Sequence, residues 1–203
     1  MFLDKELLKV EDLGEADKPL NQNWSWDRIL RSVFIKQADV LQGLYFFEDE
    51  FSEADHRSNF LFYEPRTVHE SSLSPCVHSI LASKLNMPEK AYEMYLRTAR
   101  LDLDDYNNDT EDGCHITSMA GTWLAIVKGF GGMRIRNGAL HLSPSLPAKW
   151  ESLEFTIRFR GGRVGVRLEP TRTQITNHGK KTLSLRIFDK EYELAGEGQL
   201  VHE

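Results

Sequence analysis

The sequence has few cysteines, no long apolar run and no excess of basic residues. No stretch reaches the roughly 18 consecutive apolar residues of a membrane-spanning helix, and the start, Met-Phe-Leu-Asp-Lys-Glu, lacks the basic and apolar regions of a signal peptide. The formal net charge is -6, and the arginines are interleaved with apolar residues rather than clustered as phosphate backbones require. We therefore expect neither a nucleic-acid nor a membrane partner.

The two cysteines exclude a disulfide framework. Cys76 and Cys114 both lie in apolar runs that look helical, which predicts two buried, reduced thiols in a cytoplasmic protein. The chain has 203 residues, of which 40% are hydrophobic and 28% charged. That length allows one substantial core, or one core and a small second domain.

The first two thirds of the chain have the apolar spacing of helices. Val40, Leu41, Leu44 and Tyr45 share one helical face, and the Ser71-Ser72 pair with Pro75 is a helix-start signature. Further helices are predicted over Pro88–Arg100 and Cys114–Lys128, the last ending at a cluster of glycines.

The last third changes to an alternating pattern. Residues 153–159 and 164–168 alternate apolar and polar side chains across a Gly161-Gly162 turn, and three more short strands are predicted over 173–177, 183–188 and 191–194. The sequence thus predicts a mostly helical region over residues 1–135 and a small antiparallel β-sandwich-like domain over residues 136–203.

Polar chemistry is concentrated in the stretch from Leu101 to Gly121. An acidic and amide-rich loop there leads into a predicted helix start that carries His115, Thr117 and Ser118. Free N–H groups and the positive end of the helix dipole make such a start a candidate seat for phosphate or carboxylate. The carboxylates could instead hold calcium or provide a glycosidase acid, or they could only shape the loop. Because their spacing does not match an EF-hand, we expect no metal site.

Three long motifs make the chain similar to one enzyme family. They are Ile35–Val40, Phe62–Ser74 and Asp105–Trp123, in that order, within a match that covers roughly residues 24–198. They resemble the family 65 glycoside hydrolases and phosphorylases, the family of maltose, kojibiose and trehalose phosphorylases. The resemblance implies an (α/α)6 barrel followed by a C-terminal β domain.

The resemblance also implies a reaction and a set of site residues. The reaction is reversible, inverting phosphorolysis of an α-linked glucose disaccharide to β-glucose 1-phosphate and glucose, with inorganic phosphate as co-substrate and no other cofactor. Lys36 and Gln37 are implied to contact glucose. Residues implied to bind phosphate are Ser71, Ser72, His115 and Thr117.

The chain is too short for the whole of such an enzyme. In the family, the general-acid glutamate and an N-terminal β domain precede the first motif found here, and a barrel of about twelve helices needs far more than the roughly five predicted before Gly132. We therefore expect the C-terminal portion, without a catalytic residue of its own and inactive alone. It could be completed by a complementary N-terminal chain or act as a homodimer. The alternatives are one chain of a split glycosidase and a non-catalytic carbohydrate-binding or interaction module.

Overall fold

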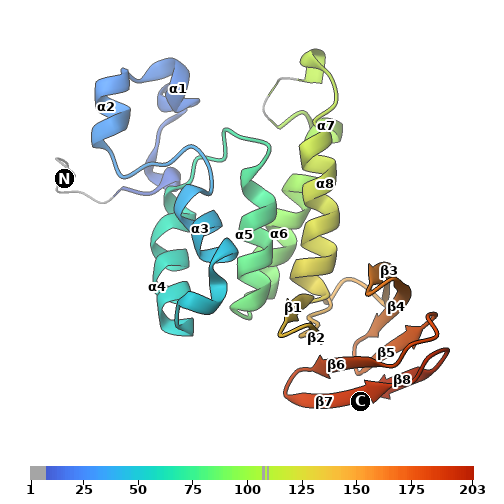
Figure 1. Ribbon diagram of the computed structural model, residues 1–203. Helices are drawn as coiled ribbons and strands as arrows, with labels where there is room; N and C mark the ends of the chain where they lie inside the picture. The colour runs from blue at the N-terminus through green and yellow to red at the C-terminus, as the bar shows by residue number, and fades with distance from the viewer. Residues whose placement is uncertain (1–7, 107, 109) are drawn as a thin grey trace.

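A row of helices leads into a β domain in the computed structural model, which describes residues 8–106, 108 and 110–203 (Figure 1). The helices are α1 (Leu20–Asn23), α2 (Trp26–Arg31), α3 (Asp39–Phe46), α4 (Glu53–Tyr63), α5 (Ser74–Lys84), α6 (Pro88–Ala99), α7 (Leu101–Asp104) and α8 (Ile116–Leu124). Short 3-10 turns are η1 (Val10–Asp12), η2 (Glu15–Asp17), η3 (Glu48–Glu50), η4 (Glu64–Arg66) and η5 (Thr110–Asp112), and α8 continues into a π-helical turn, η6 (Ala125–Phe130).

Helix α5 is the centre of the helical layer. Every residue from Ser74 to Ala82 is buried, because α3, α6, α8 and η6 all pack against this helix. Helices α3, α5 and α8 begin at the end of the layer away from the β domain, and α4 and α6 run in the opposite direction (Figure 1). The first residues of α3, α5 and α8 therefore lie at the same end of the helical layer.

The packing of α8 on α5 depends on a glycine. A Cβ atom at Gly121 would lie 2.9 Å from the Cβ of Cys76, which is closer than two carbon atoms pack. Ser118, one turn earlier on α8, is buried and donates its hydroxyl to the Thr98 carbonyl of α6 at 3.0 Å. Small and hydrogen-bonded side chains thus hold α8 close to its two neighbours.

Most helices predicted from the sequence are confirmed, with differences at the starts of α5 and α8, in α4 and in the exposure of Cys114. Helix α5 begins at Ser74, and Ser71 instead accepts a hydrogen bond from the Leu73 N–H at 3.3 Å in the turn before it. The acidic stretch after Phe46 also contains a helix that the apolar spacing did not predict, the eleven-residue α4. Cys76 is buried as expected, but the prediction of a buried Cys114 is wrong, because this residue lies in the exposed loop before α8.

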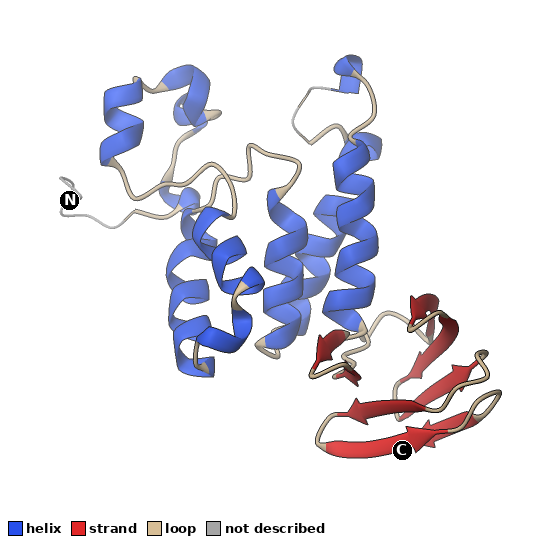
Figure 2. Cartoon of the chain, in the orientation of Figure 1, coloured by secondary structure: helices blue, strands red, loops and turns tan. Residues whose placement is uncertain are grey.

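The C-terminal domain packs two four-stranded sheets face to face (Figure 2). Its strands are β1 (Arg134–Arg136), β2 (Ala139–Leu142), β3 (Leu153–Phe159), β4 (Gly162–Glu169), β5 (Arg172–Asn177), β6 (Leu183–Ile187), β7 (Lys190–Leu194) and β8 (Gln199–His202). One sheet has the order β3-β4-β5-β8 and the other β1-β2-β6-β7. All neighbours are antiparallel except β2 and β6, which run parallel because the chain between them builds three strands of the other sheet.

An aromatic cluster joins the two domains. Trp150, in the segment between β2 and β3, packs edge-on against Tyr95 and Phe130, with ring centroids 5.3 and 5.2 Å away. The Phe130 carbonyl also accepts a hydrogen bond from the Ser145 N–H at 2.8 Å. The β domain is therefore docked on the ends of α6 and η6.

Glu48 is a second link between the domains. Its side chain, 9% exposed, accepts a hydrogen bond from Arg134 of β1 and lies 3.3 Å from Arg136 and 3.4 Å from Lys84. Burial would raise the pKa of the Glu48 carboxyl, but the Arg134 hydrogen bond and the three positive charges outweigh it, so the pKa lies below its ordinary value. The Glu48 carboxylate thus balances the positive charge of three neighbouring side chains.

We expect Gly121→Ala to destabilise the fold by about 1–2 kcal/mol, because the new methyl group would push α8 away from Cys76. The matched control is Gly43→Ala in α3, where nothing lies within 4 Å of the new Cβ, and it should stabilise the fold by about 0.5–1 kcal/mol. Urea unfolding measures both. Equal effects of the two substitutions would contradict the close packing of α8.

We expect Glu48→Gln to cost about 3 kcal/mol, because it leaves the partly buried cations, above all Arg134, without their shared counter-charge. Asp49→Asn is the control: Asp49 is 66% exposed and pairs with Arg136 at 2.6 Å, so its loss should cost about 1 kcal/mol or less. The measurement is thermal unfolding of both variants at neutral pH. A smaller loss for Glu48→Gln than for Asp49→Asn would refute the role given to Glu48.

Candidate functional site

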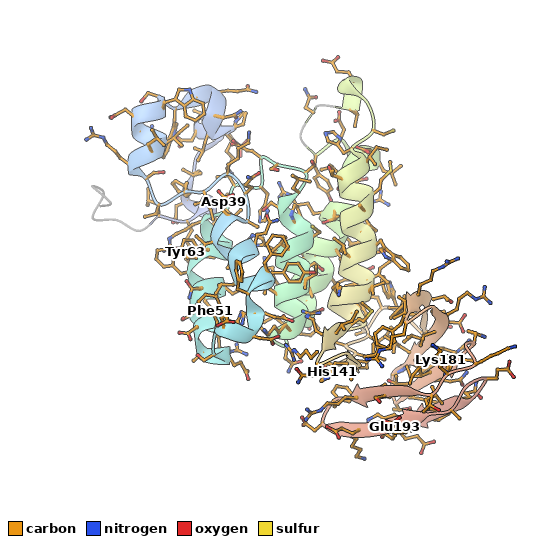
Figure 3. The ribbon with its side chains drawn as sticks, in the orientation of Figure 1. Asp39, Phe51, Tyr63, His141, Lys181 and Glu193 are labelled. Atoms are coloured by element: carbon orange, nitrogen blue, oxygen red, sulfur yellow. The ribbon has the colours of Figure 1, made fainter. Side chains whose placement is uncertain are left out.

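A short β-bridge brings the first two sequence motifs together. Ile35 pairs with Thr67 in a parallel bridge, in which the Ile35 N–H donates to the Arg66 carbonyl at 3.0 Å and the Val68 N–H donates to the Ile35 carbonyl at 2.9 Å. The segment before α3 therefore lies beside the segment that leads to α5. Figure 3 labels Asp39, the first residue of α3, and Tyr63, the last residue of α4, at this end of the layer.

Arg97 of α6 brings the third motif to the same place. Its guanidinium donates to the His69 carbonyl at 3.4 Å and lies 5.7 Å from the ring centroid of Tyr106. Burial lowers the pKa of Arg97, although the group remains charged at neutral pH. Arg97 thus ties the turn before α5 to the loop before α8.

His115 is held at the start of α8 by Asp102. One carboxylate oxygen of Asp102 accepts from the His115 N–H at 2.9 Å, and the other lies 2.6 Å from Nδ1 of the ring. A carboxylate accepts only, so the ring proton lies on Nδ1. The hydrogen bond from the His115 side chain, followed by the one from its N–H, holds the pKa of Asp102 below its ordinary value.

The structure places the expected glucose-contacting residues in the segment after the β-bridge. Lys36 is exposed, and Gln37 is half-buried, with its amide donating to the Asp39 carboxylate at 3.1 Å. The Asp39 N–H in turn donates to the Gln37 carbonyl at 2.8 Å. Gln37 is thus fixed at the start of α3, while the Lys36 side chain extends into solvent.

The expected phosphate-binding residues lie at the starts of α5 and α8. Ser71 and Ser72 are half-buried in the turn before α5, and His115 is the N-cap residue of α8, one position before the first turn where the sequence places it. Thr117 is exposed in that first turn. Two residues of the predicted loop Asn107–Gly113, Asn107 and Asp109, lie outside the described residues.

Sequence reasoning missed the residues that support this end of the layer. Arg97 looks like an ordinary surface arginine of an amphipathic helix, and only the fold shows that it reaches His69. Asp102 was one member of an acidic loop, interpreted as a possible metal ligand or catalytic acid, and the structure instead pairs it with His115. A thirteen-residue separation carries no periodic signal that could have revealed this pair.

Comparison with known proteins identifies the family. Residues 1–124 match the model of the glycosyl hydrolase family 65 central catalytic domain, and residues 133–194 match the model of the family 65 C-terminal domain. The chain therefore belongs to glycosyl hydrolase family 65. The helical region followed by a β domain agrees with this division, and none of the described helices is long and apolar enough to cross a membrane.

Its relatives include disaccharide phosphorylases. The chain is 53% identical over 195 residues to a maltose phosphorylase of Bacillus subtilis, covering 96% of this chain and 26% of that protein. It is 40% identical over 190 residues to an alpha,alpha-trehalose phosphorylase of Thermoanaerobacter brockii, covering 94% and 24%. A solved structure described as "Putative kojibiose phosphorylase from human microbiome" superposes with a TM-score of 0.89 at 39% identity, covering 96% and 27%. The chain thus spans about a quarter of the length of these proteins.

Protonation of Asp102 should release His115. Because the folded pKa of this carboxyl lies below the ordinary 3.8, the pair persists above that value and is lost as the pH falls through the lower folded pKa. Carboxyl-carbon NMR of the labelled chain measures the titration. We expect His115→Ala to move the Asp102 pKa back toward 3.8, and Thr117→Ala to leave it unchanged. An Asp102 titration that does not respond to His115→Ala would contradict the assigned pair.

Proposed function

We propose that the chain supplies the phosphate seat and part of the glucose subsite of an inverting disaccharide phosphorylase. The observation that carries the proposal is the gathering of three distant motifs where α3, α5 and α8 begin, through the Ile35–Thr67 bridge, Arg97 and the Asp102–His115 pair. The sequence similarity to a maltose phosphorylase and an alpha,alpha-trehalose phosphorylase supports the same function.

The proposed reaction cleaves an α-glucosidic bond with phosphate. A phosphate oxygen attacks the anomeric carbon from the face opposite the leaving group, and the electron pair of the broken carbon–oxygen bond leaves with the second glucose, which takes a proton from a general acid. The products are β-glucose 1-phosphate and glucose. Phosphate is itself the nucleophile, so the site must seat and orient it rather than activate water.

The residues of this chain are assigned two tasks. Lys36 and Gln37 contact the glucose whose bond is cleaved. Phosphate is bound by the hydroxyls of Ser71, Ser72 and Thr117 and by the His115 ring, supported by the N-terminal ends of α5 and α8. With Nδ1 of its ring bound to Asp102, His115 is oriented to contact phosphate through Nε2.

The general-acid glutamate is proposed to lie outside this chain. The maltose phosphorylase of Bacillus subtilis extends well beyond the matched region, since the match covers 26% of it. We place the boundary between the barrel portion and the β domain at residues 135 and 136, within β1. A complementary N-terminal segment or chain would complete the site, a homodimer stays a possible assembly, and no cofactor other than the co-substrate phosphate is required. The cytoplasmic location expected from the cysteines stays a prediction.

The proposal predicts that the purified 203-residue chain binds phosphate but releases no glucose 1-phosphate from maltose, trehalose or kojibiose. Calorimetry with inorganic phosphate should show binding that His115→Ala weakens by about 10-fold or more, as expected for the loss of one charge-assisted hydrogen bond. His178→Ala is the matched control, because His178 is an exposed histidine of the β domain. Phosphorolysis by the chain alone would overturn the assignment of the acid to another segment.

Two further outcomes would identify the alternatives. Activity that appears only when a separately produced N-terminal segment of a family 65 phosphorylase is mixed with this chain would establish a split enzyme. Binding of an oligosaccharide that does not depend on phosphate and is unaffected by His115→Ala would favour a non-catalytic carbohydrate-binding module. Both are measured by the same calorimetry and glucose 1-phosphate assay.

A further inference from the structure

Three side chains that can bind a metal ion lie close together near the N-terminal half of α5. They are Glu64 at the start of η4, His69 in the turn that follows η4, and His78 in the middle of α5. One donor atom from each lies within 4.8 Å of the other two. The two imidazole rings are 4.5 Å apart between centroids, with 69° between their planes.

Both imidazoles are buried, and three of their four ring nitrogens have no hydrogen-bond partner among the described residues. His69 is 6% exposed and His78 is fully buried, and among the residues that the structure describes no hydrogen-bond partner reaches Nε2 of His69 or either ring nitrogen of His78. Burial, followed for His69 by the neighbouring His78 and then Arg97, lowers the pKa of His69 to about 2, and burial lowers that of His78 to about 3. Neutral rings with unpaired buried nitrogens carry a desolvation cost that a ligand in the cluster would offset.

A neighbouring hydroxyl already orients one of the rings. Nδ1 of His69 lies 2.9 Å from Oγ of Ser74, the first residue of α5. When Nδ1–H donates to this hydroxyl, the lone pair of Nε2 points away from Ser74. Histidines that bind metals commonly have such a partner on the second ring nitrogen, which fixes the tautomer and the ring orientation.

We propose that Glu64, His69 and His78 form a zinc-binding site. Two imidazole nitrogens and one carboxylate are a ligand set that zinc uses in proteins, with a water molecule in the fourth position. Zinc–ligand distances of about 2.0–2.2 Å put tetrahedral donors about 3.3–3.6 Å apart, so donors within 4.8 Å need only a small adjustment. The ion would tie η4, the turn at His69 and α5 together.

The Lys90 ammonium competes with a metal ion for the Glu64 carboxylate. Its ammonium lies 3.0 Å from the Glu64 carboxylate and 2.8 Å from that of Glu93, and Lys90 and Arg97 both place positive charge near His78. Zinc must displace the ammonium from Glu64, and Glu93 can retain it. The site therefore binds zinc in competition with Lys90, and removal of this charge should strengthen binding.

This inference departs from the expectation of no metal site and does not depend on the proposed function. The expectation came from the acidic loop near residue 105, whereas these ligands are separated by five and nine residues and belong to no metal-binding motif. The approach of Glu64 to His78 arises from the packing of the segment between α4 and α5, in which His69 has a φ of 54°. Zinc binding is measured without phosphate or sugar, so its failure leaves the proposed function untouched.

The test is zinc titration of the chelator-treated 203-residue chain by calorimetry, with cobalt absorption spectra to report the ligand geometry. We expect one zinc per chain, a tetrahedral cobalt spectrum and a raised Tm. Glu64→Gln and His78→Asn should each weaken zinc binding at least about 10-fold, Ser74→Ala should weaken it about 10-fold, and Lys90→Met should strengthen it. His178→Ala should change nothing.

Circular dichroism checks that each variant folds. If His78→Asn does not fold, the decision rests on Glu64→Gln, whose side chain is 16% exposed and keeps its shape. The proposal is overturned by the absence of stoichiometric zinc binding. It is also overturned by binding that survives Glu64→Gln or that disappears in His178→Ala, since such binding belongs to a surface histidine.

Discussion

The burial of α5 from Ser74 to Ala82 constrains the rest of the helical layer. Nine consecutive residues of this helix are buried, so neighbouring elements pack against it on all sides. Two of its serines are hydrogen-bonded: Ser79 donates to the Ala91 carbonyl at 2.8 Å, and Oγ of Ser74 lies 2.9 Å from Nδ1 of His69. His78 differs, because neither of its ring nitrogens has a hydrogen-bond partner among the described residues. Gly121 lets α8 approach the helix where a larger residue would not fit. These contacts set how the neighbouring helices lie against α5.

The candidate site follows from this packing. Because α3, α5 and α8 lie beside one another and begin at the same end, the polar residues before each helix gather there. Arg97 and Asp102, from elements that end at the same place, then fix the turn before α5 and the His115 ring. The proposed phosphate seat would use N–H groups and hydroxyls, and the segments that lead into α5 and α8 bring Ser71, Ser72 and His115 to this end of the layer.

The opposite end of the layer joins the helices to the β domain. Trp150 packs among aromatic rings of α6 and η6, and Glu48 neutralises cations that come from both domains. The two ends of the helical layer therefore differ in how their charged side chains are paired. Cations at the β-domain end are compensated by a buried carboxylate, whereas at the far end Lys36 is exposed and hydroxyls line the turn before α5.

The sequence by itself determined the helix-then-strand order, the central helices and membership of family 65, because apolar periodicity and long motifs are local signals. It also located the hairpin between β3 and β4, but the turn residues are Arg160 and Gly161 rather than Gly161 and Gly162, since Gly162 already pairs with Phe159. It misplaced Cys114 and the exact starts of α5 and α8, because apolar spacing does not fix a helix boundary to the residue. Tertiary structure alone decided the pairing of Asp102 with His115 and the convergence of His69 on His78. These contacts join residues on different elements, and nothing in the local sequence encodes the distance between two elements once they pack.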